Sequence, residues 1–85
     1  MRQKLRRLII TFATTAMALK MEKVCHAYKA PGRLIPVPRE ITAGCGLAWM
    51  AAPEEKEQLE HIMQIDGVIP QEIHVLEGKK NGNSI

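Results

Sequence analysis

The order of short apolar runs and amphipathic stretches is the feature that most limits the folds open to this chain of 85 residues. A continuous β-branched and aromatic run at residues 7–12 predicts a buried strand. Apolar residues spaced at i, i+4, i+7, i+8 and i+11 from Met17 to Tyr28 predict an amphipathic helix. Two more strands, a second helix and a last strand are predicted over residues 33–37, 47–50, 53–66 and 68–76.

The resulting order predicts an α+β fold, a ferredoxin-like β-α-β-β-α-β sandwich with one antiparallel four-stranded sheet and two helices on one face. Right-handed crossovers place the first and third strands in the middle of the sheet. Pro36 cannot donate a ladder hydrogen bond, so the second strand should be an edge, where it could pair with a second copy in a homodimer. The turn before the third strand should lie beside the start of the first helix.

The net charge of +3 is unevenly distributed along the chain. Residues 8–78 contain six basic and nine acidic residues, so the basic excess belongs to the two ends. We therefore expect a basic N-terminal extension (1–7), a single folded domain (8–77) and a flexible C-terminal tail (78–85). The basic leader has no interleaved aromatic residues and no apolar run reaches the roughly 20 residues of a membrane span, so neither nucleic acid nor membrane is an expected partner.

The N-terminus also has features of a secretory signal, because basic residues precede a moderately apolar stretch that ends in Ala16-Met17-Ala18. Three threonines dilute that stretch, and cleavage there would remove the predicted first strand. The two cysteines lie at dissimilar sites and do not require an oxidising compartment. We expect a cytoplasmic protein.

Cys45 is the strongest candidate for a chemically reactive residue. Gly44 and Gly46 on either side allow tight backbone conformations and leave room for another protein's sulfur. The alternative is that Cys45 is a small buried hydrophobe at the start of a strand. Cys25 lies on the apolar stripe of the first helix, where a packing role is expected.

Thiolate formation is favoured by a helix N-terminus and by nearby cations. The predicted topology offers both influences to the loop before the third strand. Thr14 and Thr15 can cap the first helix, and Arg33 and Arg39 flank the same extended segment. These residues are therefore candidate activating groups for Cys45.

Other chemistries have little support in the sequence. The histidines lack the spacing of a zinc site, and the methionines mostly fall at expected core positions, so we expect no metal and no cofactor. Phosphate-binding glycine motifs are absent, and Ser84 is the only serine. A thiol oxidoreductase would need a nearby resolving cysteine, but the chain has no Cys-x-x-Cys.

The runs IITFATTAMALKMEK and GRLIPVPREITAGCGLAW, followed by a Pro-Glu-rich second helix, resemble the selenium/sulfur carrier-like proteins. The resemblance covers about residues 8–76, and its most specific element is RLIP-x-PREI-x-x-x-CGL at residues 33–47. It implies a short ferredoxin-like domain whose CGL cysteine, here Cys45, carries sulfur or selenium. The motif neighbours of that cysteine are Pro38, Arg39, Glu40, Gly46 and Leu47.

The leading hypothesis is a carrier rather than a turnover enzyme. Cys45 would accept a persulfide or perselenide from a donor enzyme and pass it to an acceptor protein. Arg39 would stabilise the anionic sulfur, and Glu40 would order the loop or recognise partners. The alternative is a non-catalytic binding or regulatory module that senses a metal or small ligand, or acts as a structural partner in a complex.

Overall fold

Four strands form one antiparallel sheet in the order β2-β3-β1-β4 in the computed structural model, which describes residues 5–78. The elements along the chain are β1 (Leu5–Thr11), α1 (Thr15–Tyr28), β2 (Arg33–Pro36), β3 (Leu47–Ala51), the 3-10 helix η1 (Pro53–Glu55), α2 (Lys56–Asp66) and β4 (Glu72–Gly78). This is the predicted α+β ferredoxin-like order. The central positions of β1 and β3 and the edge position of β2 are confirmed.

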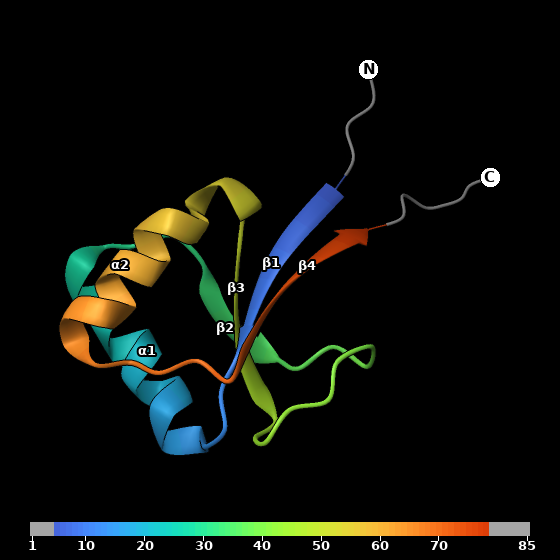
Figure 1. Ribbon diagram of the computed structural model, residues 1–85, viewed down its shortest axis with the longest axis horizontal. Coiled ribbons are helices and arrows are strands. Elements are labelled where there is room, and N and C mark those ends of the chain that lie inside the picture. Colours follow the sequence, from blue (N-terminus) through green and yellow to red (C-terminus); the bar gives the residue numbers. More distant parts are fainter. Residues whose placement is uncertain (1–4, 79–85) are drawn as a thin grey trace.

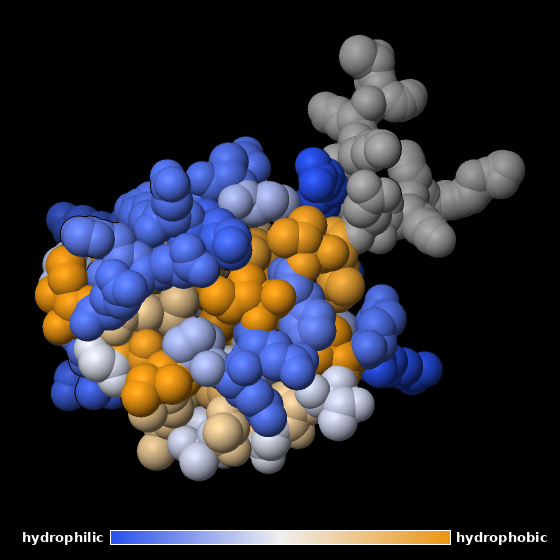
Figure 2. All heavy atoms as spheres, viewed as in Figure 1, coloured by the Kyte–Doolittle hydropathy of each residue, from blue (hydrophilic) through white to orange (hydrophobic). Residues whose placement is uncertain are grey.

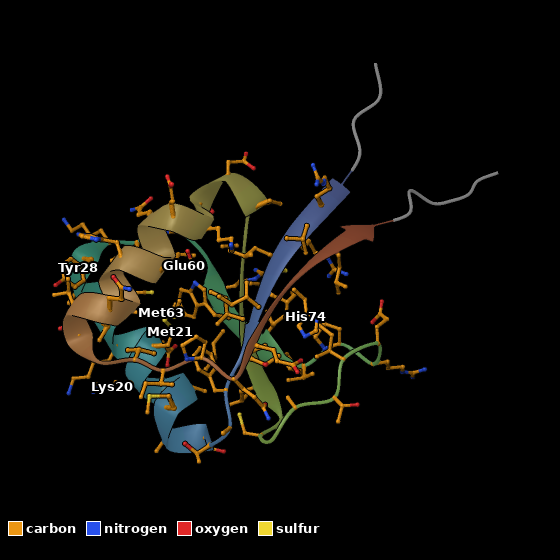
Figure 3. All side chains as sticks on the ribbon, in the orientation of Figure 1. Lys20, Met21, Tyr28, Glu60, Met63 and His74 are labelled. Atoms are coloured by element: carbon orange, nitrogen blue, oxygen red, sulfur yellow. The ribbon has the colours of Figure 1, made fainter. Side chains whose placement is uncertain are left out.

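Both helices pack on one face of the sheet (Figure 1). Leu8, Ile10 and Phe12 project from β1 and the residue after it into the core beneath the helices, and all three are fully buried. Met21 of α1 and Met63 of α2 belong to the same core and lie close together in Figure 3. The alternation of side chains along β1 therefore directs every second residue toward the helices.

Within residues 5–78 the opposite face of the sheet carries no helix, but apolar side chains are buried there. Ile9 and Ala48 from the two central strands are fully buried there, and Ile41 from the segment between β2 and β3 packs against them with 8% of its surface exposed. Ile35 and Met50 pack at the edge of this second, smaller core. The segment at residues 37–46 is thus anchored to the sheet by an apolar contact, which fixes the position of the loop that follows.

Capping residues explain where α1 begins and where α1 and α2 end. Thr14 is the N-cap of α1, and its side-chain oxygen accepts a hydrogen bond from the Met17 amide at 3.2 Å. Thr15 is the first helical residue, so the expectation that both threonines cap is wrong for Thr15. Lys29, with φ 56°, and Gly67, with φ 72°, take the left-handed conformation that ends α1 and α2.

The strand boundaries differ from the sequence-based prediction at both ends. β1 begins at Leu5, which pairs with Gly78, so residues 5–7 belong to the sheet rather than to an extension. Residues 68–70 are not in a strand, because Val68 continues the α2 terminus by donating to the Met63 carbonyl at 2.9 Å. Most of the predicted basic extension and of the C-terminal tail lies outside the described residues.

Two residues expected on the apolar helix stripes are exposed instead. Tyr28 is 49% exposed and Ile65 is 60% exposed. A hydrogen bond from Tyr28 to the Asp66 carboxylate, with a smaller effect of burial, raises the pKa of Tyr28. No helix within residues 5–78 has the length and apolar character needed to cross a bilayer.

Candidate functional site

Cys45 lies at the end of the segment that connects β2 to β3, beside the start of α1. Its backbone N–H donates a hydrogen bond to the Phe12 carbonyl at 3.3 Å. Phe12 stands two residues before Thr14, the N-cap of α1. The predicted proximity of the cysteine loop and the start of the first helix is therefore confirmed. The antiparallel pairing of β1 with β3 produces it, because this pairing brings the residue after β1 beside the residues before β3.

Gly44 and Gly46 have different roles beside Cys45. A Cβ at Gly44 would lie 2.6 Å from the Ala13 carbonyl oxygen, so only glycine allows this close approach of two backbones. A Cβ at Gly46 would meet no atom within 4 Å. Neither glycine has a positive φ. The predicted tight packing of backbone is therefore found at Gly44, without a left-handed conformation, whereas Gly46 lies in open space.

Cys45 is partly buried against the larger core, and its sulfur contacts both backbone polar groups of one residue. The Leu47 amide lies 3.4 Å from the sulfur as a hydrogen-bond donor, and the Leu47 carbonyl lies 3.4 Å from it as an acceptor. The carbonyl can accept the thiol proton, whereas the amide N–H stabilises negative charge on sulfur. The sulfur of Cys45 thus has one hydrogen-bond acceptor and one donor, both from the backbone of Leu47.

Gln71 supports this loop and was not among the residues predicted from the sequence. Its side-chain oxygen accepts a hydrogen bond from the Gly44 amide at 2.9 Å. Its own backbone N–H donates to the Thr11 carbonyl at 2.7 Å. Gln71 therefore connects the residues before β4 to the loop that carries Cys45, across the end of β1. A glutamine outside any motif gives no sequence signal for such a role.

The structure separates the two arginines that were predicted to flank Cys45. Arg33 is the first residue of β2 and pairs with Met50, whereas the end of β2 nearest Cys45 pairs Pro36 with Leu47. Arg33 therefore lies at the far end of this strand pair, and its predicted place beside Cys45 is wrong. Its position is a consequence of strand direction, which a linear spacing does not reveal.

Arg39 and Glu40 lie in the turn that follows Pro38, on the same loop as Cys45. The Ile41 amide donates to the Pro38 carbonyl at 3.0 Å and closes this turn. Both charged side chains are exposed, and neither forms an ion pair or hydrogen bond with another described residue. The turn thus presents one cation and one anion to solvent.

Cys25 has the opposite environment. It lies on the core-facing side of α1 with 1% of its surface exposed, so its predicted packing role is confirmed. Burial raises the pKa of the Cys25 thiol to about 11. Cys25 and Cys45 are both free cysteines. Desolvation of one thiol and partial exposure of the other leave Cys45 as the cysteine suited to react with another molecule.

Two surface depressions lie away from Cys45. One, of about 440 Å³, lies between α2 and the start of β4, where Figure 2 shows apolar atoms bordered by hydrophilic residues. The other, of about 410 Å³, lies at the C-terminal end of α1 and includes Cys25, Arg33 and Trp49. Among residues 5–78, no group of three or more His, Cys, Asp or Glu side chains is placed to hold a metal ion.

Comparison with protein families gives one match over most of the chain. The family described as "Putative Se/S carrier protein-like" matches residues 7–75. The matched region reaches from β1 into β4 and includes the whole loop that carries Cys45. No curated protein and no solved structure matches the chain.

Proposed function

The chain belongs to the Se/S carrier protein-like family, and from that premise we propose that Cys45 carries a sulfur or selenium atom between two proteins. Cys45 accepts the atom from a donor enzyme as a persulfide or perselenide and passes it to an acceptor protein. In this role the chain is a carrier protein rather than a turnover enzyme. Both cysteines are free, which suits work in a reducing compartment and supports the cytoplasm as its location.

The observation that carries the proposal is the environment of the Cys45 sulfur. The thiol is partly exposed, and the Leu47 amide is directed at it from 3.4 Å. During transfer the Cys45 Sγ carries negative charge, first as the attacking thiolate and later as the leaving group, and an N–H donor at Sγ stabilises that charge. The N-terminus of α1 on the adjoining segment adds a favourable dipole.

Each transfer is a balanced exchange that needs no external oxidant. The Cys45 thiolate attacks the outer sulfur of the donor's persulfide, a Cys45 S–S bond forms, and the donor S–S bond breaks. The donor leaves as a thiolate, and the proton of the transferred S–H group stays with the transferred sulfur. The acceptor's thiolate then attacks the outer sulfur on Cys45 in the same way. Perselenide transfer follows the same steps with selenium as the outer atom.

The exposed turn at Arg39 and Glu40 gives the Cys45 loop a second feature that suits it to sulfur transfer. The guanidinium of Arg39 is not engaged with another described residue, so it is available to a negatively charged persulfide or to the transition state of transfer. Glu40 limits the positive charge of the turn and can contact a partner. Thr14 holds the start of α1 beside the loop, and Thr15 begins the helix.

Sulfur loading from a cysteine desulfurase tests the proposal. Incubation with the desulfurase and cysteine should add one sulfur atom to Cys45, as read by mass spectrometry of the intact protein and of its peptides. Cys45→Ser should abolish the addition, whereas the matched Cys25→Ser variant should retain it. Sulfur found on Cys25 alone, or on neither cysteine, would refute the proposal.

A further inference from the structure

The loop that carries Cys45 is hydrogen-bonded to three different parts of the fold. The Gly44 amide donates to the side chain of Gln71 at 2.9 Å, and the Cys45 amide donates to the Phe12 carbonyl at 3.3 Å. The Gly46 carbonyl accepts a hydrogen bond from the first residue after β2, at 3.0 Å. These partners lie just before β4, just after β1 and just after β2, at one end of the sheet in Figure 1.

Of these hydrogen bonds, only the one from Gly44 is accepted by a side chain. A bond between two backbone groups does not depend on the identity of either residue, whereas this one needs an acceptor in the side chain at position 71. The amide oxygen of glutamine provides that acceptor. The identity of residue 71 therefore decides whether the Gly44 amide is held.

The backbone at Gln71 is itself fixed to the end of β1. The Gln71 amide donates to the Thr11 carbonyl at 2.7 Å. The side-chain hydroxyl of Thr11, a fully buried residue, accepts from the Glu72 amide at 3.1 Å and donates to the Glu72 carbonyl at 3.3 Å. Because the base of the Gln71 side chain is already ordered, the bond to Gly44 costs only side-chain rotamer entropy.

The sulfur contacts of Cys45 depend on the backbone that this bond holds. The Cys45 sulfur lies 3.4 Å from the amide of Leu47, two residues later, so the torsion angles of Cys45 and Gly46 decide whether the two groups meet. Packing does not restrain Gly46, because a Cβ there would meet no atom within 4 Å, and glycine has wide conformational freedom. Hydrogen bonds at the ends of this stretch therefore supply the restraint.

We propose that Gln71 is a positioning residue for sulfur transfer that acts on Cys45 through Gly44. Its side-chain oxygen fixes the peptide before Cys45, so that the sulfur stays on the Leu47 amide while it carries negative charge. The inference rests on the proposed carrier function of Cys45. It adds a residue from a separate segment of the fold to the groups that serve the transfer step.

Three variants separate positioning from packing. Gln71→Met keeps the length of the side chain but removes the acceptor oxygen, whereas Gln71→Glu keeps an acceptor oxygen. Gln64→Met is the matched control, because Gln64 is exposed on α2 and forms no hydrogen bond with another described residue.

Each protein is loaded with inorganic polysulfide in about 0.5 M salt, which screens the charge added by glutamate. The Cys45 thiolate attacks a sulfur atom of the polysulfide, one S–S bond forms and one breaks, and the shortened polysulfide leaves with the electron pair. Mass spectrometry over time gives the loading rate.

Gln71→Met should slow loading of Cys45 by roughly threefold to tenfold, a moderate effect because the Gly44 bond lies at the surface, where water competes for the amide. Gln71→Glu should restore most of the rate, and Gln64→Met should match wild type. Amide hydrogen exchange followed by NMR gives a second readout. Gln71→Met should speed exchange at Gly44 and Leu47 and leave the amides of β1 as in wild type.

The positioning role is refuted if Gln71→Met is loaded at the wild-type rate, or if Gln71→Glu is loaded no faster than Gln71→Met. Faster exchange throughout the sheet would also refute it, because the variant would then act through global stability. If wild-type Cys45 takes up no sulfur from polysulfide, the carrier function fails, and exchange at Gly44 and Leu47 still decides whether Gln71 holds the loop.

Discussion

The two cysteines of this small domain lie in different environments, one in the core and one on a surface loop. Cys25 lies in a helix and in the core, where surrounding apolar side chains remove water and raise the pKa of its thiol to about 11. Cys45 lies on a loop that two neighbouring segments hold in place, and its sulfur contacts the amide and the carbonyl of Leu47. The comparison shows that position in the fold, rather than the number of cysteines, decides which thiol is available.

The Cys45 region is held by backbone contacts as well as by apolar packing, whereas the Cys25 region is held by side-chain packing. Phe12, Ala13 and Gln71 fix the loop through hydrogen bonds and one close backbone approach. Such contacts order the loop while Cys45 stays only partly buried against the core. A fold that must bury a core in few residues can in this way keep one ordered thiol at its surface.

The largest expected difference between the two regions is in the rate at which their cysteine thiols are alkylated. At pH 8 a thiol with a pKa of about 11 is ionised in roughly one molecule in a thousand, and Cys25 is also shielded from reagents. Iodoacetamide should therefore alkylate Cys45 at least about 100-fold faster than Cys25 in the native protein. Peptide mass spectrometry over time measures both rates, and in urea they should converge. Equal native rates would remove the distinction on which the account depends.

The two glycines beside Cys45 provide the next largest contrast. Gly44→Ala places a Cβ 2.6 Å from the Ala13 carbonyl, and this overpacking should cost about 2–3 kcal/mol of unfolding free energy. Gly46→Ala meets open space and should change it by less than about 0.5 kcal/mol. Urea denaturation of both variants measures the difference. A Gly46→Ala variant as unstable as Gly44→Ala would mean that the loop is held in another way.

The pH dependence of the unfolding free energy tests whether the Cys25 thiol is desolvated. The pKa of Cys25 rises from 9.0 in the unfolded reference to about 11 in the folded protein, so the folded state keeps a proton that the unfolded state loses. The resulting stability is fully present below pH 9 and is lost as the pH rises toward 11. Between pH 8 and pH 10.5 wild type should lose about 2 kcal/mol more than Cys25→Ala, measured by urea denaturation at each pH. Parallel pH profiles for the two proteins would show that Cys25 is not desolvated.

The smallest expected effect concerns the two arginines. Arg39 lies on the Cys45 loop and Arg33 at the far end of β2, so only Arg39→Gln should slow sulfur loading of Cys45, by roughly two- to fivefold. The loading rate from inorganic polysulfide measures this without a partner protein. If Arg33→Gln slowed loading as much as Arg39→Gln, the effect would come from net charge rather than from the loop.

The sequence was sufficient for the fold because its local patterns agree with the final topology. The apolar run at residues 7–12, the spacing in α1 and Pro36 on β2 together predicted the order of elements and the edge strand. The residues whose placement was not predicted are those whose position depends on tertiary contacts. Val68 is buried but follows the cap of α2 and donates to its last turn, and Tyr28 completes the apolar stripe of α1 but lies half exposed beside Asp66.

The site was predictable only in part, for a similar reason. The family motif and the predicted topology were enough to select Cys45 and to place its loop beside Thr14. The displacement of Arg33 required the strand direction and register, and the role of Gln71 required knowledge that β4 begins beside the end of β1. Ile41, which anchors the loop on the second face of the sheet, resembles any other apolar residue in the sequence.

The most direct test of the central claim uses the protein as the cell makes it. Purified from its own organism without reductant and examined by mass spectrometry, a fraction of the protein should carry one extra sulfur or selenium atom, located on the peptide that contains Cys45. The peptide that contains Cys25 should be unmodified in the same sample. An adduct on Cys25 with Cys45 unmodified would contradict the account.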